Sequence, residues 1–88
     1  MLFRSEDFAA AGLAARIELS RQGVGADAFA ASDRGEREPA LDGLLAAMAD
    51  ADADTRELLR QAIVGILSED PADPSARDYR RKLAAALG

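Results

Sequence analysis

The sequence predicts an all-α fold, a small bundle of antiparallel helical hairpins with about four helices. In three runs, within residues 39–48, 58–67 and 79–87, apolar side chains recur every three or four residues, the spacing that one face of a helix requires. Proline, aspartate and glycine stand between these runs, where helices begin and end. No run of β-branched residues has the pattern of a strand, so sheet is not expected.

The first part of the chain is expected to hold one long helix and a linker. Ser5 is the candidate N-cap of the helix, with acidic residues in the first turn, and the helix is expected to end near Gln22. Residues 23–38 contain three glycines and a weaker apolar pattern. We interpret them as a linker with a short helical turn anchored by Phe29.

The first helix carries apolar residues on two sides. One side holds Phe8, Ala15 and Leu19, and the nearly opposite side holds Ala10, Leu13 and Ile17. Such a helix is sandwiched within the fold, pairs with another molecule, or kinks at Gly12. The chain has 21 alanines and few large apolar side chains to cover both sides. We therefore expect a homo-oligomer, most simply a twofold dimer, with Phe8, Leu13 and Ile17 among its contacts.

The second helix is expected to begin with Pro39, whose missing N–H needs no partner in the first turn. Its core stripe comprises Leu41, Leu44, Leu45 and Met48. The acidic run 50–54 then ends the helix. Its spacing resembles the start of a calcium loop but lacks the later glycine and glutamate, so we interpret it as a turn of helix-capping carboxylates. Asp54 and Glu57 form a predicted capping box for the third helix.

The third helix has the widest apolar face, formed by Leu58, Leu59, Ala62, Ile63, Ile66 and Leu67. Val64 lies off this face and is a candidate contact with a partner, although a lone exposed valine usually has no role. Asp73 and Pro74 start a fourth helix, whose inner stripe comprises Tyr79, Leu83, Ala86 and Leu87. One core is expected to contain Leu44, Leu45, Leu59, Ile63, Ile66, Tyr79 and Leu83.

Composition argues against catalysis, metal binding and nucleic-acid binding. Because the chain has no cysteine and no histidine, no disulfide, Cys/His zinc site or imidazole base can form, and its serines have no histidine to activate them. The stretch from Gly23 to Ala28 superficially matches a dinucleotide motif, but no strand precedes it, so no cofactor is expected. A net charge of −5 disfavours binding to phosphate backbones.

The same composition suggests where the protein works. No apolar run has the length of a membrane span and no export signal is recognisable, so we expect a cytoplasmic protein that does not enter membranes. Arginine far outnumbers lysine and alanine is abundant, which suggests a bacterial source.

Four segments carry a resemblance to a known family, and in chain order they are Ala40-Leu-Asp-Gly-Leu-Leu, Arg56-Glu-Leu-Leu-Arg-Gln, Asp70-Pro-Ala-Asp-Pro and Tyr79-Arg-Arg-Lys-Leu-Ala-Ala-Ala-Leu. Through them, residues 40–87 resemble the C-terminal tail of the chaperedoxin-type co-chaperones, where tetratricopeptide-like hairpins follow a thioredoxin-like domain. The resemblance implies a region that holds unfolded client proteins and passes them to chaperones. No thioredoxin domain and no Cys-x-x-Cys motif are present, so the redox function of that family is not implied.

Together these patterns predict a non-catalytic protein–protein interaction module. The resemblance implies that this module is a chaperone-associated scaffold or adaptor. A single domain over residues 1–88 is expected, with residues 1–38 preceding a three-helix segment over residues 39–88. An acidic rim is expected to favour a partner protein with a basic contact surface, and it comprises Asp42, Asp50, Asp52 and Glu57. The alternative is a small acidic regulator of the antitoxin, immunity or phage-inhibitor type that masks a basic target surface. A helical adaptor domain of a bacterial defence system would have a similar sequence.

Overall fold

The computed structural model describes residues 5–69 and 72–87, with side chains from residue 10 onward. Within these residues the chain forms five helices, α1 (Ser5–Arg21), α2 (Ala26–Asp33), α3 (Arg37–Met48), α4 (Ala53–Glu69) and α5 (Pro74–Leu87), and no strand. The prediction of an all-α helical bundle is confirmed, with one helix more than expected.

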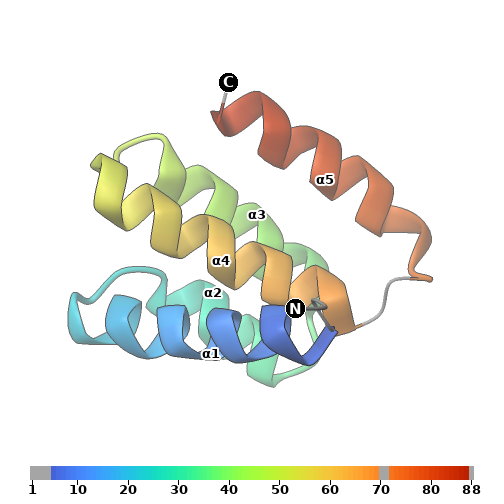
Figure 1. Ribbon diagram of the computed structural model, residues 1–88, viewed down its shortest axis with the longest axis horizontal. Coiled ribbons are helices and arrows are strands. Elements are labelled where there is room, and N and C mark those ends of the chain that lie inside the picture. The colour runs from blue at the N-terminus through green and yellow to red at the C-terminus, as the bar shows by residue number, and fades with distance from the viewer. Residues whose placement is uncertain (1–4, 70–71, 88) are drawn as a thin grey trace.

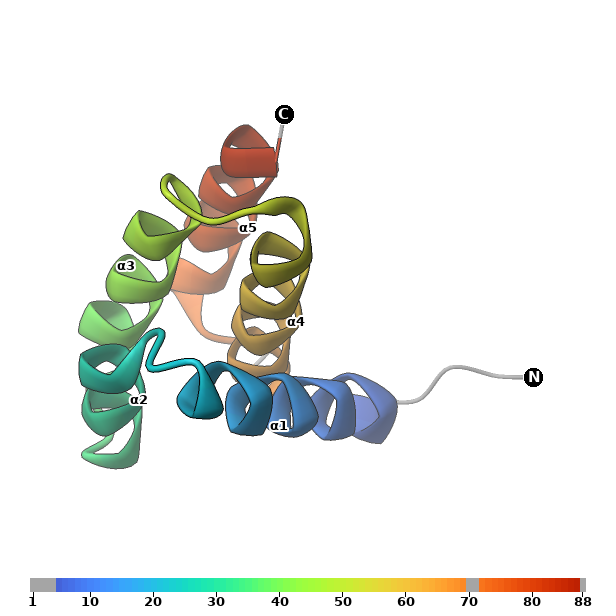
Figure 2. The same ribbon diagram turned by 90° about the vertical axis from the view of Figure 1, so that its left-hand side faces the viewer.

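Helix α4 lies in the middle of the bundle. On one side it packs along α1, which runs in the opposite direction, and on the other side it packs against α3 (Figures 1 and 2). Helix α2 packs against α3, and α5 covers a further side of α3. The long helices α1 and α4 are thus paired although the α2–α3 segment separates them in sequence.

Helices α1 and α4 approach each other closely at two glycines. A Cβ atom on Gly12 would lie 2.9 Å from the Cα of Gly65 and 3.1 Å from the carbonyl oxygen of Gln61. At the other end of the pair, the Thr55 hydroxyl donates a hydrogen bond of 3.3 Å to the side-chain oxygen of Gln22. Helix α1 continues through Gly12, so this glycine permits close packing of two helices and does not end or divide α1.

The core lies where α1, α3 and α4 meet. Its largest fully buried side chains are Leu19, Leu41, Leu44, Met48, Leu59 and Ile63. Every residue predicted for the core is buried except Leu45, which is partly buried and packs against the core. Ala86 and Leu87 were expected on the inner stripe of the last helix but are exposed, because the buried residues of α5 end at Leu83 and no other helix covers its final turn among the described residues.

The segment interpreted as a linker contains a complete helix, α2. Ala28, Phe29 and Ala31 are buried, and α2 is tied to α1 by Arg16, which binds both carboxylate oxygens of Asp33 at 2.8 and 2.6 Å. The Arg16 guanidinium also lies 5.0 Å from the centroid of the Phe29 ring. The short helical turn predicted around Phe29 is therefore a longer helix, Ala26–Asp33, which packs into the bundle and is more than part of a linker. The alanines there gave a weak apolar pattern, but their small side chains allow close helix packing.

The start of α4 also differs from the prediction. The Asp52 carboxylate accepts a hydrogen bond of 2.7 Å from the Thr55 N–H, so Asp52 caps the helix in place of Asp54. Glu57 does not reach back to close a capping box and instead binds an arginine one turn later. Three aspartates alternate in this turn, and the sequence alone did not distinguish the one whose backbone leads into the helix.

Two other helix starts follow the predicted chemistry more closely. Helix α3 begins two residues before Pro39. Pro39 still falls in the first turn, where an N–H would have no partner within the helix. Before α5, the Asp73 carboxylate accepts hydrogen bonds from the N–H and hydroxyl of Ser75 at 2.9 and 2.8 Å, as an N-cap should. The predicted cap at Ser5 lies outside the described side chains.

Candidate protein-contact surfaces

The outer face of α1 carries two of the three large apolar side chains that are exposed in the described part of the chain. Leu13 and Ile17 are 61% and 52% exposed, and Ala10 beside them is also exposed. On the opposite side of the same helix, Ala15 and Leu19 are buried in the core. The sequence allowed this helix to be sandwiched within the fold, to pair with another molecule or to kink at Gly12. Among the described residues no other element covers its outer face, so the helix is not sandwiched within the fold. The predicted contact Phe8 lies outside the described side chains.

A second apolar surface is a groove between α4 and α5, with a volume of about 270 Å³. Its lining comprises Arg60, Val64, Leu67, Ser68, Arg80, Leu83, Ala84 and Leu87. Val64 is partly buried in this groove, so the residue that falls off the predicted core face lies at a concave site. The Ser68 hydroxyl is occupied, because it donates a hydrogen bond of 2.7 Å to the Val64 carbonyl. The exposed part of the groove is therefore mainly apolar, with an arginine on each helix.

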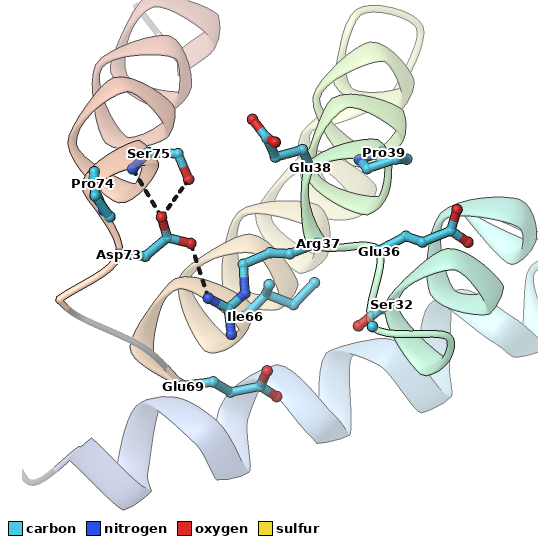
Figure 3. A pocket seen from close by; sticks show the side chains of 11 residues that line it. Ser32, Glu36, Arg37, Glu38, Pro39, Ile66, Glu69, Asp73, Pro74 and Ser75 are labelled. Carbon is cyan, nitrogen blue, oxygen red and sulfur yellow. Dashed lines mark hydrogen bonds and ion pairs between the residues drawn. The ribbon is translucent and has the colours of Figure 1, made fainter.

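A third site is an open depression of about 710 Å³ where the first turns of α3 and α5 face the end of α4 (Figure 3). Four carboxylates lie around it, those of Glu36, Glu38, Glu69 and Asp73. From the start of α3, the half-buried Arg37 reaches across to Asp73 at 3.0 Å, as Figure 3 shows. Hydrogen bonds from Ser75, and then this arginine, hold the pKa of Asp73 below its ordinary value. The depression is thus acidic, and its ion pair joins two helix starts.

Tyr79 anchors α5 against α3. Its ring is 4% exposed, and its hydroxyl donates a long hydrogen bond of 3.4 Å to the Glu38 carbonyl oxygen. Burial, followed by the hydrogen bond and negative charge of Asp42, raises the pKa of Tyr79 to about 12. The Lys82 ammonium lies 4.8 Å from the ring centroid. Tyr79 is a core residue, in agreement with the sequence-based interpretation.

The four residues of the predicted acidic rim come from two parts of the bundle. Asp42 lies within α3 beside Tyr79, whereas Asp50, Asp52 and Glu57 lie at or just after the turn between α3 and α4. All four are exposed, but Asp52 caps α4 and Glu57 binds Arg60 with hydrogen bonds of 3.0 and 2.9 Å. The carboxylates around the depression form another acidic set of four, which the sequence did not indicate because they come from three separate segments.

The described part of the chain also lacks two other kinds of feature, a cluster of metal ligands and a membrane-spanning helix. No group of three or more acidic side chains there is arranged so that it could hold a metal ion. None of the described helices combines the length and apolar character needed to cross a membrane.

Comparison with known proteins defines the class of this protein. A tetratricopeptide repeat model matches residues 9–87, so the chain belongs to the tetratricopeptide repeat family. No match was found among curated proteins or among solved structures. The match begins in α1 and includes α2, so it extends well beyond the segment whose sequence resembled tetratricopeptide hairpins.

Membership of this family confirms the predicted tetratricopeptide-like fold and supports the general prediction of a protein–protein interaction module. It does not test the narrower prediction of a chaperone-associated role. Tetratricopeptide repeats stack helix pairs into protein-binding surfaces, which supports a protein–protein interaction module. The relationship to the chaperedoxin-type co-chaperones stays a prediction.

Proposed function

We propose that this chain is a non-catalytic module that binds another protein through the outer face of α1. The observation that carries the proposal is the exposure of Leu13 and Ile17 on a helix whose opposite face is buried in the core. Completing the burial of these two half-exposed side chains in an interface would contribute about 2–3 kcal/mol. That is roughly a 30- to 150-fold change in affinity.

The same face supports self-association. Two copies that pair through α1 about a twofold axis would cover Leu13 and Ile17 of both chains, and such a homodimer would compete with the partner for this face. Light scattering at high micromolar concentration should therefore show a dimer for the parent protein and a monomer for a Leu13→Ser/Ile17→Ser variant.

We infer a scaffold or adaptor role for the partner-bound state, associated with chaperones or their clients. An exposed aliphatic face suits the apolar segments of unfolded clients, and the resemblance of residues 40–87 to co-chaperone tails supports this role. A second candidate is an acidic regulator that masks a basic surface. The carboxylates around the depression at the starts of α3 and α5, together with the net charge of −5, favour it.

The test is a measured affinity for a partner recovered from the native host and then purified. The Leu13→Ser/Ile17→Ser variant should bind it roughly 30- to 150-fold more weakly than the parent. Ala11→Ser changes an exposed position of the same helix that points away from Leu13 and Ile17 and is the matched control, which should bind as the parent does. Equal affinity of the double variant and the parent would refute the proposed face, and turnover of a small molecule by the purified protein would refute the module as a whole.

Salt dependence separates the two roles. An acidic regulator should lose affinity for its basic target as salt rises, since exposed charges are screened over about 10 Å at 0.1 M. A scaffold that uses the apolar face of α1 should keep its affinity.

A further inference from the structure

The groove between α4 and α5 has a shape that accommodates one more helix. Repeat proteins of this kind stack helices so that each buries its apolar face against neighbours on both sides. Helix α5 buries Ala76, Tyr79 and Leu83, with α3 as its main neighbour, while its flank beside α4 is open. No further helix lies over this flank in residues 5–69 and 72–87. A third helix laid along the groove would contact α4 and α5 together.

The floor of the groove is apolar along its length. Val64 and Leu67 come from α4, and Leu83, Ala84 and Leu87 come from α5, with Leu87 46% exposed. Side chains spaced by three and four residues on two neighbouring helices form ridges that accept the ridges of another helix. The occupant expected from this shape is an amphipathic helix.

The charge of the groove determines which charge a bound helix should carry. Arg60 and Arg80 line it and no carboxylate does. Because α4 and α5 run in opposite directions (Figure 1), and the groove uses residues 60–68 of one and 80–87 of the other, the two arginines stand at opposite ends. Arg60 forms an ion pair with Glu57. Arg80, in contrast, makes no hydrogen bond or ion pair within the described part of the chain.

Helix α5 is also the cationic part of an acidic protein. It carries four basic residues, Arg77, Arg80, Arg81 and Lys82, and one acidic residue, Asp78, which gives a net +3 on a chain of net charge −5. Association at this groove is therefore favoured for acidic ligands and disfavoured for basic ones.

We propose that the groove between α4 and α5 binds an amphipathic helix of a partner protein, with aspartate or glutamate at both ends of its apolar face. The proposal rests on the proposed protein-binding function but uses a surface separate from α1. A second copy of this chain is a poorer occupant. Its exposed helix face carries Arg21 one turn after Ile17, and this arginine would meet the groove arginines.

The probe is a pair of synthetic amphipathic helical peptides of about 15 residues, roughly four turns. Both have leucine at helical spacing, and the leucines are flanked by glutamate in one peptide and by lysine in the other. The full chain should bind the glutamate peptide at least about tenfold more tightly. Arg80→Glu should remove or reverse this preference, and Leu87→Ser should weaken binding of the glutamate peptide. The matched control is Arg81→Glu, which makes the same charge change outside the groove lining and should keep the preference.

Three results would overturn the proposal. Equal effects of Arg80→Glu and Arg81→Glu would show that the peptide responds only to overall charge. Binding lost in Leu13→Ser/Ile17→Ser but kept in Leu87→Ser would place the peptide on α1. Groove variants that abolish self-association but not peptide binding would make a second copy the occupant. Since the α1 variants test the proposed function and the groove variants test this inference, failure of either is recognised separately.

Discussion

The substitution Gly12→Ala tests the packing of α1 on α4 because two effects of opposite sign compete there. In the interior of an ordinary helix, replacing glycine by alanine stabilises the folded state by about 1 kcal/mol. At Gly12 the new Cβ would lie 2.9 Å from the Cα of Gly65, well inside the roughly 3.5–4.0 Å of a normal carbon–carbon contact. The atoms it meets belong to the backbone of α4, so a whole helix must shift.

The expected net effect is destabilisation. Overpacking of this kind costs about 1–3 kcal/mol, of which the helix propensity of alanine offsets about 1 kcal/mol. We therefore expect Gly12→Ala to lower the free energy of unfolding by about 1 kcal/mol, or Tm by roughly 4–8 °C for a domain of this size. Urea unfolding followed by circular dichroism gives the value directly.

The control for this prediction is Ala14→Gly in the same helix. Ala14 is exposed, so its replacement changes helix propensity without changing a helix contact and should destabilise by about 0.5–1 kcal/mol. If Gly12→Ala instead stabilises the protein by as much as Ala14→Gly destabilises it, the close approach of the two helices is wrong.

Three further predictions concern the core, a cap and a buried phenol. Ile63→Ala, at a fully buried position, should lower the free energy of unfolding by about 2–4 kcal/mol, and a variant as stable as the parent would contradict the core assignment. Asp52→Ala should lower the Tm more than Asp54→Ala, which removes only a first-turn carboxylate and no cap, and the reverse order would restore Asp54 as the cap. The single tyrosine, Tyr79, should titrate near pH 12 in an absorbance titration of the folded protein, and a pKa near 10 would show that its hydroxyl is exposed. Because its pKa is raised in the folded state, this group contributes stability below pH 10 that is lost as the pH rises toward 12.

The helical elements followed from the sequence where large apolar residues carry the pattern. The faces around Leu44, Ile63 and Tyr79 are buried as their spacing requires. Helix α2 was predicted only as a short turn anchored by Phe29, because its packing depends on alanines, which give little contrast between a buried and an exposed face. The role of Gly12 in close helix packing depends on Gly65, which is distant in sequence and lies beside Gly12 only in the folded chain.

The contact surfaces were less predictable than the core. The exposure of Leu13 and Ile17 agrees with a helix that has two apolar sides, but nothing local showed which side would face the core. Arg80, Ala84 and Leu87 are spaced as one helix face, yet the groove that they line exists only because α5 lies beside α4. Sites built from separate helices depend on tertiary packing, which helical periodicity alone does not specify.

Photo-cross-linking of the complex with the purified partner tests the central claim most directly. A photoreactive amino acid at position 17, on the outer face of α1, should join the chain to its partner. The same amino acid at the exposed position 46 of α3 is the control and should not. A partner that links to position 46 and not to position 17 would contradict the claim that this protein binds another through the outer face of α1.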